Sequence, residues 1–169
     1  VVIVDEAYID FGGTSALSLL EKYDNLLIVQ TFSKSRAMAG LRIGFCIGSE
    51  QMIQYLNDVK FSFNSYTMNL PAQVMGVEAV KDDVYFKNTT AKIVATRERM
   101  KKELGELGFS FPDSKTNFLF ATHESVPAGE IFQALREHDI YVRHWDKPRI
   151  GNYLRITIGT DEQMDKLVA

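Results

Sequence analysis

Two short apolar runs constrain the fold of this chain more than any other feature, because polar residues with reactive side chains follow each of them. The first run, Val1-Val2-Ile3-Val4, ends in Asp5-Glu6-Ala7-Tyr8, and the second, Leu26-Leu27-Ile28-Val29, leads into Thr31-Phe32-Ser33-Lys34. Runs of this length that are rich in Val, Ile and Leu indicate buried strands. A short helix predicted over 14–23 makes them a strand–helix–strand unit with parallel strands. Both polar segments then lie at the carboxyl ends of neighbouring strands, where open α/β sheets bind ligands.

The residue types at these strand ends suit pyridoxal 5'-phosphate (PLP). Its chemistry requires a lysine amine that forms a Schiff base with the aldehyde and then moves protons, and Lys34 is the candidate. It also requires a carboxylate against the pyridine nitrogen, and Asp5 is predicted to fill that role. Tyr8, in the same turn as Asp5, can donate to the ring hydroxyl.

The phosphate group of PLP needs hydroxyls, backbone N–H groups and a planar cation, which Thr31, Ser33 and Arg42 could provide. Each of these residues also has an ordinary interpretation. An aspartate after a strand often caps a turn, a loop lysine is usually solvated, and serine and threonine often cap helices. The joint arrangement is much rarer than its parts, and it favours the cofactor interpretation.

The chain resembles the second half of the fold-type I, class I and II aminotransferases over essentially its whole length. The segments that carry this resemblance are Val4 through Phe11, Thr31 through Phe45, Thr116-Asn117-Phe118 and Leu154 through Thr160. The resemblance implies a PLP-dependent enzyme that acts as a homodimer on a small amino or keto compound. It also implies that the loop containing Asn64, Ser65 and Tyr66 lies at the dimer interface.

Three further residues are candidates for substrate binding. Aminotransferases of this class hold the substrate carboxylate with a strand arginine, and Arg155 matches that position. The segments Tyr8-Ile9-Asp10-Phe11 and Leu154 through Thr160 resemble a branch whose substrate carries a phosphate instead, so Arg155 would bind that phosphate. Arg143 would add a second cation, and Asn117 could approach the substrate. The ordinary alternatives are arginines that face solvent or pair with acids, and an asparagine that binds a loop.

The fold class predicted for the chain is α/β. Residues 1–85 are predicted to be the C-terminal part of a PLP-binding large domain with a mainly parallel sheet, and 86–169 a small α+β domain. A long helix over about 83–107, ended by Gly108, joins them, and its charged run 97–103 is predicted to be solvated. The other predicted helices cover 14–23 (capped by Thr14), 50–59, 71–81 (opened by Pro71) and 127–138, with one more from 161 that Thr160 caps. Further strands are predicted over 109–111, 117–121, 140–143 and 153–158. Another covers 43–47, and because it follows the lysine segment so closely, we expect it to be antiparallel to the strand before it.

Composition excludes several classes of function. The net charge is −3 with no basic stripe, which argues against nucleic-acid and membrane partners. The single cysteine, Cys46, excludes internal disulfides, and the three histidines show no metal-ligand spacing. No apolar stretch reaches transmembrane length, so we expect a soluble, cytoplasmic protein. Because the chain opens inside an apparent strand without methionine, we expect a fragment that is inactive alone.

Three alternatives remain open at the level of sequence. The same lysine, aspartate and arginines would serve an aromatic amino acid aminotransferase. A PLP lyase or decarboxylase would share the cofactor residues as well. A non-catalytic folded domain that holds no cofactor would explain the pattern by coincidence.

Overall fold

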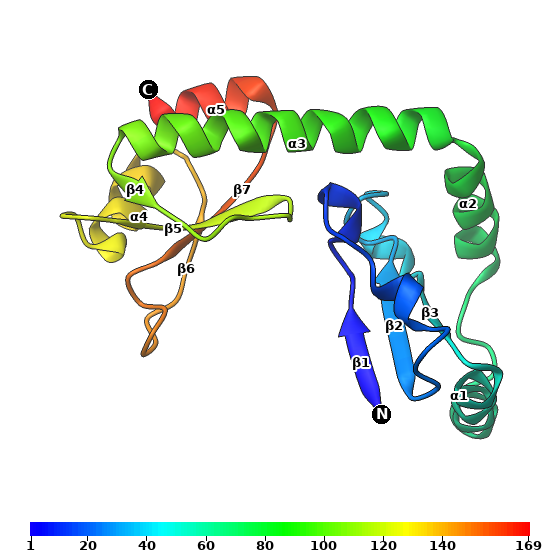
Figure 1. Cartoon of the computed structure of the whole chain (residues 1–169). Coiled ribbons are helices and arrows are strands. Elements are labelled where there is room, and N and C mark those ends of the chain that lie inside the picture. Colours follow the sequence, from blue (N-terminus) through cyan, green and yellow to red (C-terminus); the bar gives the residue numbers. More distant parts are fainter. The chain divides into compact units, whose positions relative to one another are not determined.

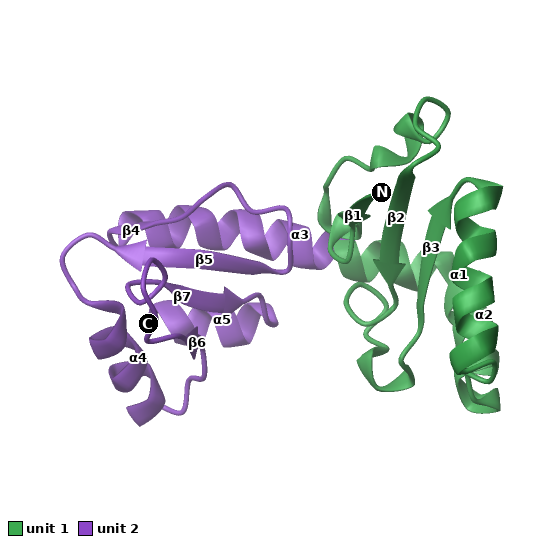
Figure 2. Ribbon diagram, turned by 90° about the horizontal axis from the view of Figure 1, so that it is seen from below, with its two compact units in different colours: residues 1–90 green, residues 91–169 purple.

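The computed structural model describes all of residues 1–169, which divide into two compact units at 1–90 and 91–169 (Figure 2). The division falls inside the long helix α3 (Asp83–Glu106), which covers the range predicted for it. The assignment of 1–85 and 86–169 to a large and a small domain of a longer enzyme stays a prediction. No helix is both long and apolar enough to span a membrane.

The first unit contains a three-stranded sheet in the order β1-β2-β3, formed by Val2–Asp5, Leu26–Thr31 and Gly44–Gly48 (Figure 1). β1 and β2 are parallel, with Asp5 opposite Val29. β2 and β3 are antiparallel, with Thr31 opposite Gly44. Residues 32–43 contain only a three-residue 3₁₀ turn, too short for the crossover that parallel strands need. The sheet of this unit is therefore mixed, and the antiparallel pairing predicted for 43–47 is confirmed.

The first strand was predicted to be buried, but it is exposed. Val1, Val2 and Ile3 are 79%, 52% and 63% exposed. β1 lies at the edge of the sheet and pairs only with β2, so one side of it has no neighbouring strand. The buried strand of the first unit is β2, where Leu26 through Ile28 are covered, and Phe11, Ile43 and Ala72 of the same unit are buried as well.

The helix predicted over 14–23 is also wrong. Only a 3₁₀ helix, Ala16–Leu19, forms there, and its cap is Ser15, not Thr14. The carboxylate of Glu6 accepts hydrogen bonds from the Ser15 hydroxyl and the Ala16 N–H, and these bonds hold the start of the segment against the end of β1.

The two helices that follow β3 begin at side-chain caps. α1 (Glu50–Phe63) is capped by Ser49, and α2 (Leu70–Lys81) by Asn69, with Pro71 in its first turn as predicted. α1 extends beyond the predicted 50–59.

The second unit is an antiparallel sheet with helices. Its strands follow the order β4-β5-β7-β6, formed by Phe109–Ser110, Phe118–His123, Leu154–Thr157 and Arg143–His144. α4 (Ala128–Glu137), α5 (Asp161–Val168) and the second part of α3 complete it, and Thr160 and Gln163 form a capping box. The strand predicted over 140–143 begins only at Arg143, because Asp139 adopts a left-handed φ of 57° and the Ile140 N–H bonds to Leu135, closing α4.

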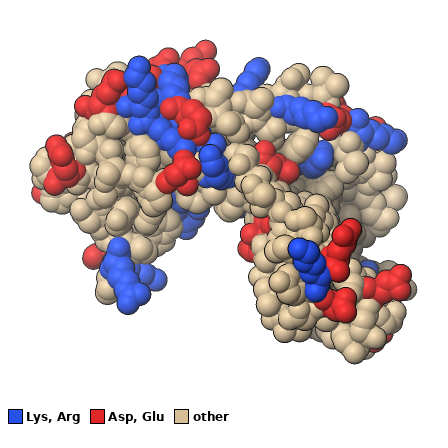
Figure 3. Space-filling view, in the orientation of Figure 1, with Lys and Arg blue, Asp and Glu red and all other residues tan.

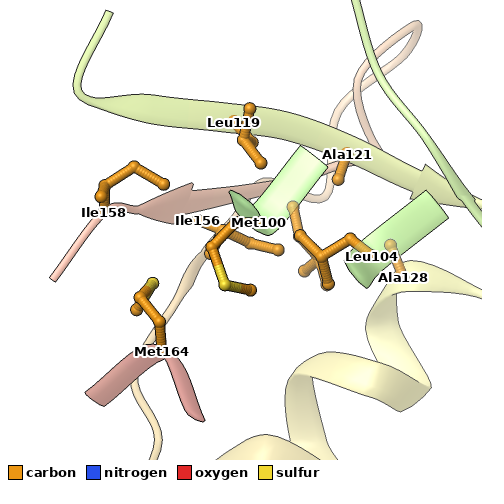
Figure 4. Packing of buried hydrophobic residues seen from close by; sticks show 9 residues of the cluster. Met100, Leu104, Leu119, Ala121, Ala128, Ile156, Ile158 and Met164 are labelled. Carbon is orange, nitrogen blue, oxygen red and sulfur yellow. The ribbon is translucent and has the colours of Figure 1, made fainter. Parts of the chain in front are cut away.

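One apolar cluster forms the core of the second unit (Figure 4). The side chains alternate along β5 and β7, so alternate residues point to opposite faces of the sheet. One set joins side chains from α3, α4 and α5 in the core, namely Leu119, Ala121, Leu154, Ile156, Met100, Leu104, Ala128 and Met164. The other set, on the opposite face, includes Phe118, Phe120 and Arg155.

The charged run of α3 is only partly solvated. Arg97 is 1% exposed, and its Nη1 donates to the backbone oxygen of Thr116 at 2.9 Å. The prediction of a solvated run is therefore wrong at Arg97, because this guanidinium reaches the loop that precedes β5. Elsewhere basic and acidic side chains are interspersed over the visible face and form no stripe of one sign (Figure 3).

Candidate active site

The turn after β1 carries two of the predicted cofactor residues. Asp5 ends the strand, and its Oδ1 accepts the N–H of Ala7 at 2.9 Å, while its other oxygen has no hydrogen-bond partner in the chain. Tyr8 lies three residues further on, immediately before the 3₁₀ turn Ile9–Phe11. The carboxylate of Asp5 is exposed, and one of its oxygens is available to a ligand.

The loop after β2, residues 32–43 (the lysine loop), brings Lys34 to this turn. The Nζ atom of Lys34 lies 5.3 Å from the centroid of the Tyr8 ring, and the lysine is half-buried. Parallel pairing of β1 and β2 puts their carboxyl ends at one edge of the sheet, and this pairing explains the meeting of residues distant in sequence. The structure thus brings Lys34 and Tyr8 together.

The residues predicted to hold a phosphate group lie at the base of the lysine loop. The Thr31 hydroxyl bonds to the Ser33 hydroxyl at 2.9 Å and to the backbone oxygen of Ile43 at 3.2 Å, and the Ser33 N–H donates back to Thr31. Arg42 is exposed and has a left-handed φ of 57°, with its Nη1 bonded to the oxygen of Ala39. A non-glycine residue held in this conformation is often found at ligand sites. Thr31 and Ser33 are hydrogen-bonded to each other, but the Arg42 guanidinium is hydrogen-bonded to Ala39 and to neither of them.

Two hydrogen-bond groups that support this region were missed from the sequence. Glu6, next to Asp5, is 6% exposed and accepts from Ser15, Ala16 and Gln30. The buried hydroxyl of Ser35 donates to Asp10 and so ties the lysine loop to the 3₁₀ turn after Tyr8. Alternation along β1 was the available signal, because it places Glu6 on the side opposite to Asp5.

In the second unit Arg155 occupies the middle of β7, on the sheet face away from the core. It pairs across the sheet with Phe120 on β5 and with Arg143 on β6. Its Cζ lies 4.1 Å from the centroid of the Phe118 ring, which supports the flat guanidinium. Its Nε is buried and has no hydrogen-bond partner. A buried donor without a partner is rare in proteins and indicates a group that a ligand or water would satisfy.

The other two substrate candidates differ from each other. Arg143 is exposed, and its Cζ lies 5.4 Å from the Trp145 ring. The Oδ1 of Asn117 is buried and unpaired, like the Nε of Arg155, while its backbone oxygen accepts from Ile158. These two are the only buried side-chain polar atoms without a partner, and both belong to residues singled out from the sequence.

Comparison with known proteins gives a consistent result. The family described as "Aminotransferase class I and II" matches residues 1–169, the whole chain. The chain belongs to this family. It is 53% identical over 99% of its length to the histidinol-phosphate aminotransferase of Brachyspira hyodysenteriae, of which it covers 48%. The chain thus spans about half the length of the relatives it matches.

Solved aminotransferase structures share its fold. The chain superposes on the histidinol-phosphate aminotransferase of Clostridium acetobutylicum with a TM-score of 0.87 at 25% identity, covering 98% of this chain and 51% of that one. For the enzyme of Sinorhizobium meliloti, solved in complex with pyridoxal-5'-phosphate, the TM-score is 0.83 at 26% identity, with coverage of 98% and 46%.

Proposed function

We propose that these residues form the C-terminal half of a PLP-dependent aminotransferase that acts on histidinol phosphate. The enzyme would exchange an amino group between L-histidinol phosphate with 2-oxoglutarate and imidazole-acetol phosphate with L-glutamate. The observation that carries the proposal is the 53% identity over 99% of the chain to an enzyme of that name. The contact between Lys34 and Tyr8 and the unpaired Nε of Arg155 support it independently.

The residues of the first unit fit PLP by their chemistry. When bound, PLP supplies an electron sink for carbanions formed at the substrate. Lys34 would bond the cofactor and move the proton, and its amine is already held beside a phenol. The unpaired oxygen of Asp5 would accept from the pyridine N–H, and Tyr8 would donate to the ring hydroxyl.

The phosphate of the cofactor would be held at the base of the lysine loop. Thr31 and Ser33 offer two hydroxyls whose mutual hydrogen bond keeps them in place. Arg42, in its left-handed conformation, offers a guanidinium that is exposed and able to turn toward an anion. Hydroxyl donors together with a planar cation are the groups that bind phosphate in proteins.

The substrate's own phosphate would bind to the second unit. Arg155 has a buried Nε without a partner on a rigid strand position above Phe118. Arg143, its direct neighbour across β6 and β7, would add the second positive charge that a dianion favours, and the unpaired Oδ1 of Asn117 would accept a donor of the substrate. Charge-assisted hydrogen bonds are about twice as strong as neutral ones, which makes the phosphate the main source of affinity.

A homodimer is part of the proposal. Phe61, Phe63 and Tyr66 are 63%, 89% and 93% exposed around the end of α1, and large apolar side chains exposed together are typical of an interaction surface. A second subunit that covers this loop would bury these rings. Sedimentation of the full-length protein tests this, and a monomer at micromolar concentration would contradict it.

Steady-state kinetics with two amino donors test the proposed activity. The full-length protein is assayed with 2-oxoglutarate and either histidinol phosphate or phenylalanine. The proposal expects kcat/KM for histidinol phosphate to be higher by about 100-fold, because Arg155 and Arg143 bind its phosphate. A preference for phenylalanine would identify an aromatic amino acid aminotransferase instead. A protein that binds PLP but transfers no amino group to 2-oxoglutarate would contradict the aminotransferase proposal.

A further inference from the structure

We infer that Glu6 is a positioning residue for the cofactor site: its buried carboxylate fixes the turn that presents Asp5 and Tyr8 to the cofactor. This inference rests on the proposed function, because it assigns Glu6 a role at the same site. Glu6 would not touch the cofactor. It would act through Asp5, the residue before it, and Tyr8, two residues after it.

The carboxylate of Glu6 is buried and fully occupied by neutral donors. Oε1 accepts from the Ala16 N–H at 2.7 Å and from the Ser15 hydroxyl at 3.0 Å. Oε2 accepts from the same hydroxyl at 2.9 Å and from Nε2 of Gln30 at 2.9 Å. No Lys or Arg pairs with it, although the side chain is only 6% exposed. Burying a charge is costly unless hydrogen bonds compensate for it, so these bonds stabilise one position of the carboxylate.

The donors come from two segments, so the carboxylate links three parts of the first unit. Gln30 belongs to β2, Ser15 and Ala16 begin the 3₁₀ helix, and Glu6 itself follows β1. Loss of the carboxylate would leave these donors without an acceptor in a place that water reaches poorly. All three segments would then be free to shift relative to one another.

The backbone of Glu6 transmits this position to the site. Its N–H donates to the oxygen of Val29, and its oxygen accepts from the N–H of Ile9, the residue after Tyr8. Asp5 bonds to Ala7 within the same turn. A displaced Glu6 would therefore move Asp5 and Tyr8 together, and with them the ring that lies 5.3 Å from Nζ of Lys34.

The test compares three variants of the full-length protein. Glu6→Ala removes the acceptor. Glu6→Gln keeps a side-chain oxygen that accepts from Ser15 and Ala16. The side-chain amide of Gln30 can rotate so that its oxygen accepts from the new NH2 group at position 6. Ser49→Ala is the matched control, in the same unit but outside the site. It removes the half-buried hydroxyl that caps α1, which accepts from the Met52 N–H and donates to the oxygen of Asp24.

Two measurements separate positioning from general destabilisation: the Kd for PLP, by fluorescence titration, and the pH midpoint of the absorbance of bound PLP. We expect Glu6→Ala to weaken PLP binding by about 10- to 100-fold and to move the pH midpoint, because Asp5, which would accept from the cofactor ring, and Tyr8, which would donate to it, are displaced. Glu6→Gln and Ser49→Ala should stay within about threefold of the wild type and keep its midpoint. Should Glu6→Ala not fold, Gln30→Ala removes one donor only and should weaken binding by an intermediate factor.

Two results would overturn the inference. One is a Kd and pH midpoint for Glu6→Ala equal to those of Ser49→Ala, which would make Glu6 a stabilising residue only. The other is a loss in Glu6→Gln as large as in Glu6→Ala, which would point to the charge of Glu6 and not to its hydrogen bonds. Failure of the proposed function looks different, because it shows in the wild-type protein, which would then bind no PLP or would bind PLP without transferring an amino group from histidinol phosphate to 2-oxoglutarate.

Discussion

The candidate residues of the two units differ in how their polar groups are satisfied. In the first unit Thr31, Ser33 and Glu6 are engaged with neighbours inside the chain. In the second unit the Nε of Arg155 and the Oδ1 of Asn117 are buried without partners. Under the proposed function, the first arrangement would be preorganised and would receive a cofactor with little rearrangement. The second retains unsatisfied groups that a substrate would pair with, which suits a ligand that comes and goes at every turnover.

The largest effect we predict is at Lys34. Lys34→Ala should lower the transamination rate of the full-length protein by about 10²- to 10⁴-fold, because the amine that moves the proton is lost. Initial rates at saturating substrate measure this. Lys22→Ala, which changes an exposed lysine of the same unit, serves as control and should keep the wild-type rate. Equal rates for the two variants would remove Lys34 from the mechanism.

The packing of the two units can be compared by shortening one apolar side chain in each unit of the 169-residue chain. Leu119→Ala should lower the free energy of unfolding by about 2–5 kcal/mol, because Leu119 is fully buried in the core of the second unit. Ile3→Ala should change it by less than about 0.5 kcal/mol, since Ile3 is 63% exposed. Urea denaturation measures both. If the two losses were equal, the contrast between a buried core and an exposed edge strand would be wrong.

Arg155→Met should separate binding from stability. Loss of the guanidinium should raise KM for histidinol phosphate by about 10- to 100-fold. The melting temperature should not fall, because the variant also removes a buried donor that lacks a partner. Arg136→Met is the control, since Arg136 also stacks on a ring, that of Phe132, but is exposed on α4. A large drop in melting temperature with KM unchanged would make Arg155 a structural residue.

The smallest effect concerns acid stability of the second unit. The Thr96 hydroxyl first, and then Arg99, lower the pKa of Asp161 by hydrogen bonding to its carboxylate. A lowered pKa in the folded state stabilises the fold above the unfolded value of about 3.9, and this contribution is lost as the pH falls through the lowered pKa. Thr96→Val should therefore lower the free energy of unfolding near pH 7, where this contribution is fully present, and move the midpoint of acid unfolding to a higher pH. The difference from the wild type should disappear as the pH falls through the lowered pKa of Asp161.

Circular dichroism across an acid titration measures that midpoint. The shift should be modest, because Asp161 is exposed and solvent screens its interactions. An unchanged midpoint would show that the Thr96 hydroxyl does not hold the Asp161 carboxylate in solution.

Local patterns predicted much of this structure. The antiparallel turn from β2 to β3, the proline at the start of α2 and the cap at Thr160 follow from loop length and residue type, and all are confirmed. The long helix ending before Gly108 follows from periodicity, and Gly108 has the positive φ of 88° that suits it.

The errors arose where tertiary contacts decide the outcome. Residues 14–23 do not form the predicted helix, and Ser15 within them is hydrogen-bonded to Glu6 at the end of β1. The guanidinium of Arg97 is buried because it donates to Thr116, in the loop before β5. β1 is apolar but exposed, because it lies at the edge of the sheet. The sequence of a strand does not show whether that strand lies at an edge or between two others. At the site, residue types indicated Lys34 and Asp5, but only the folded chain placed Tyr8 beside Lys34 and left Arg155 with an unpaired atom.

Trapping of PLP on the full-length protein with borohydride, followed by peptide mapping, tests the central claim most directly. Residues 1–169 contain eleven lysines, and every lysine of the full-length protein can react weakly. A preorganised site at the ends of β1 and β2 predicts one dominant adduct, at Lys34, which disappears in Lys34→Ala. Adducts spread over the lysines without preference for Lys34 would contradict the account.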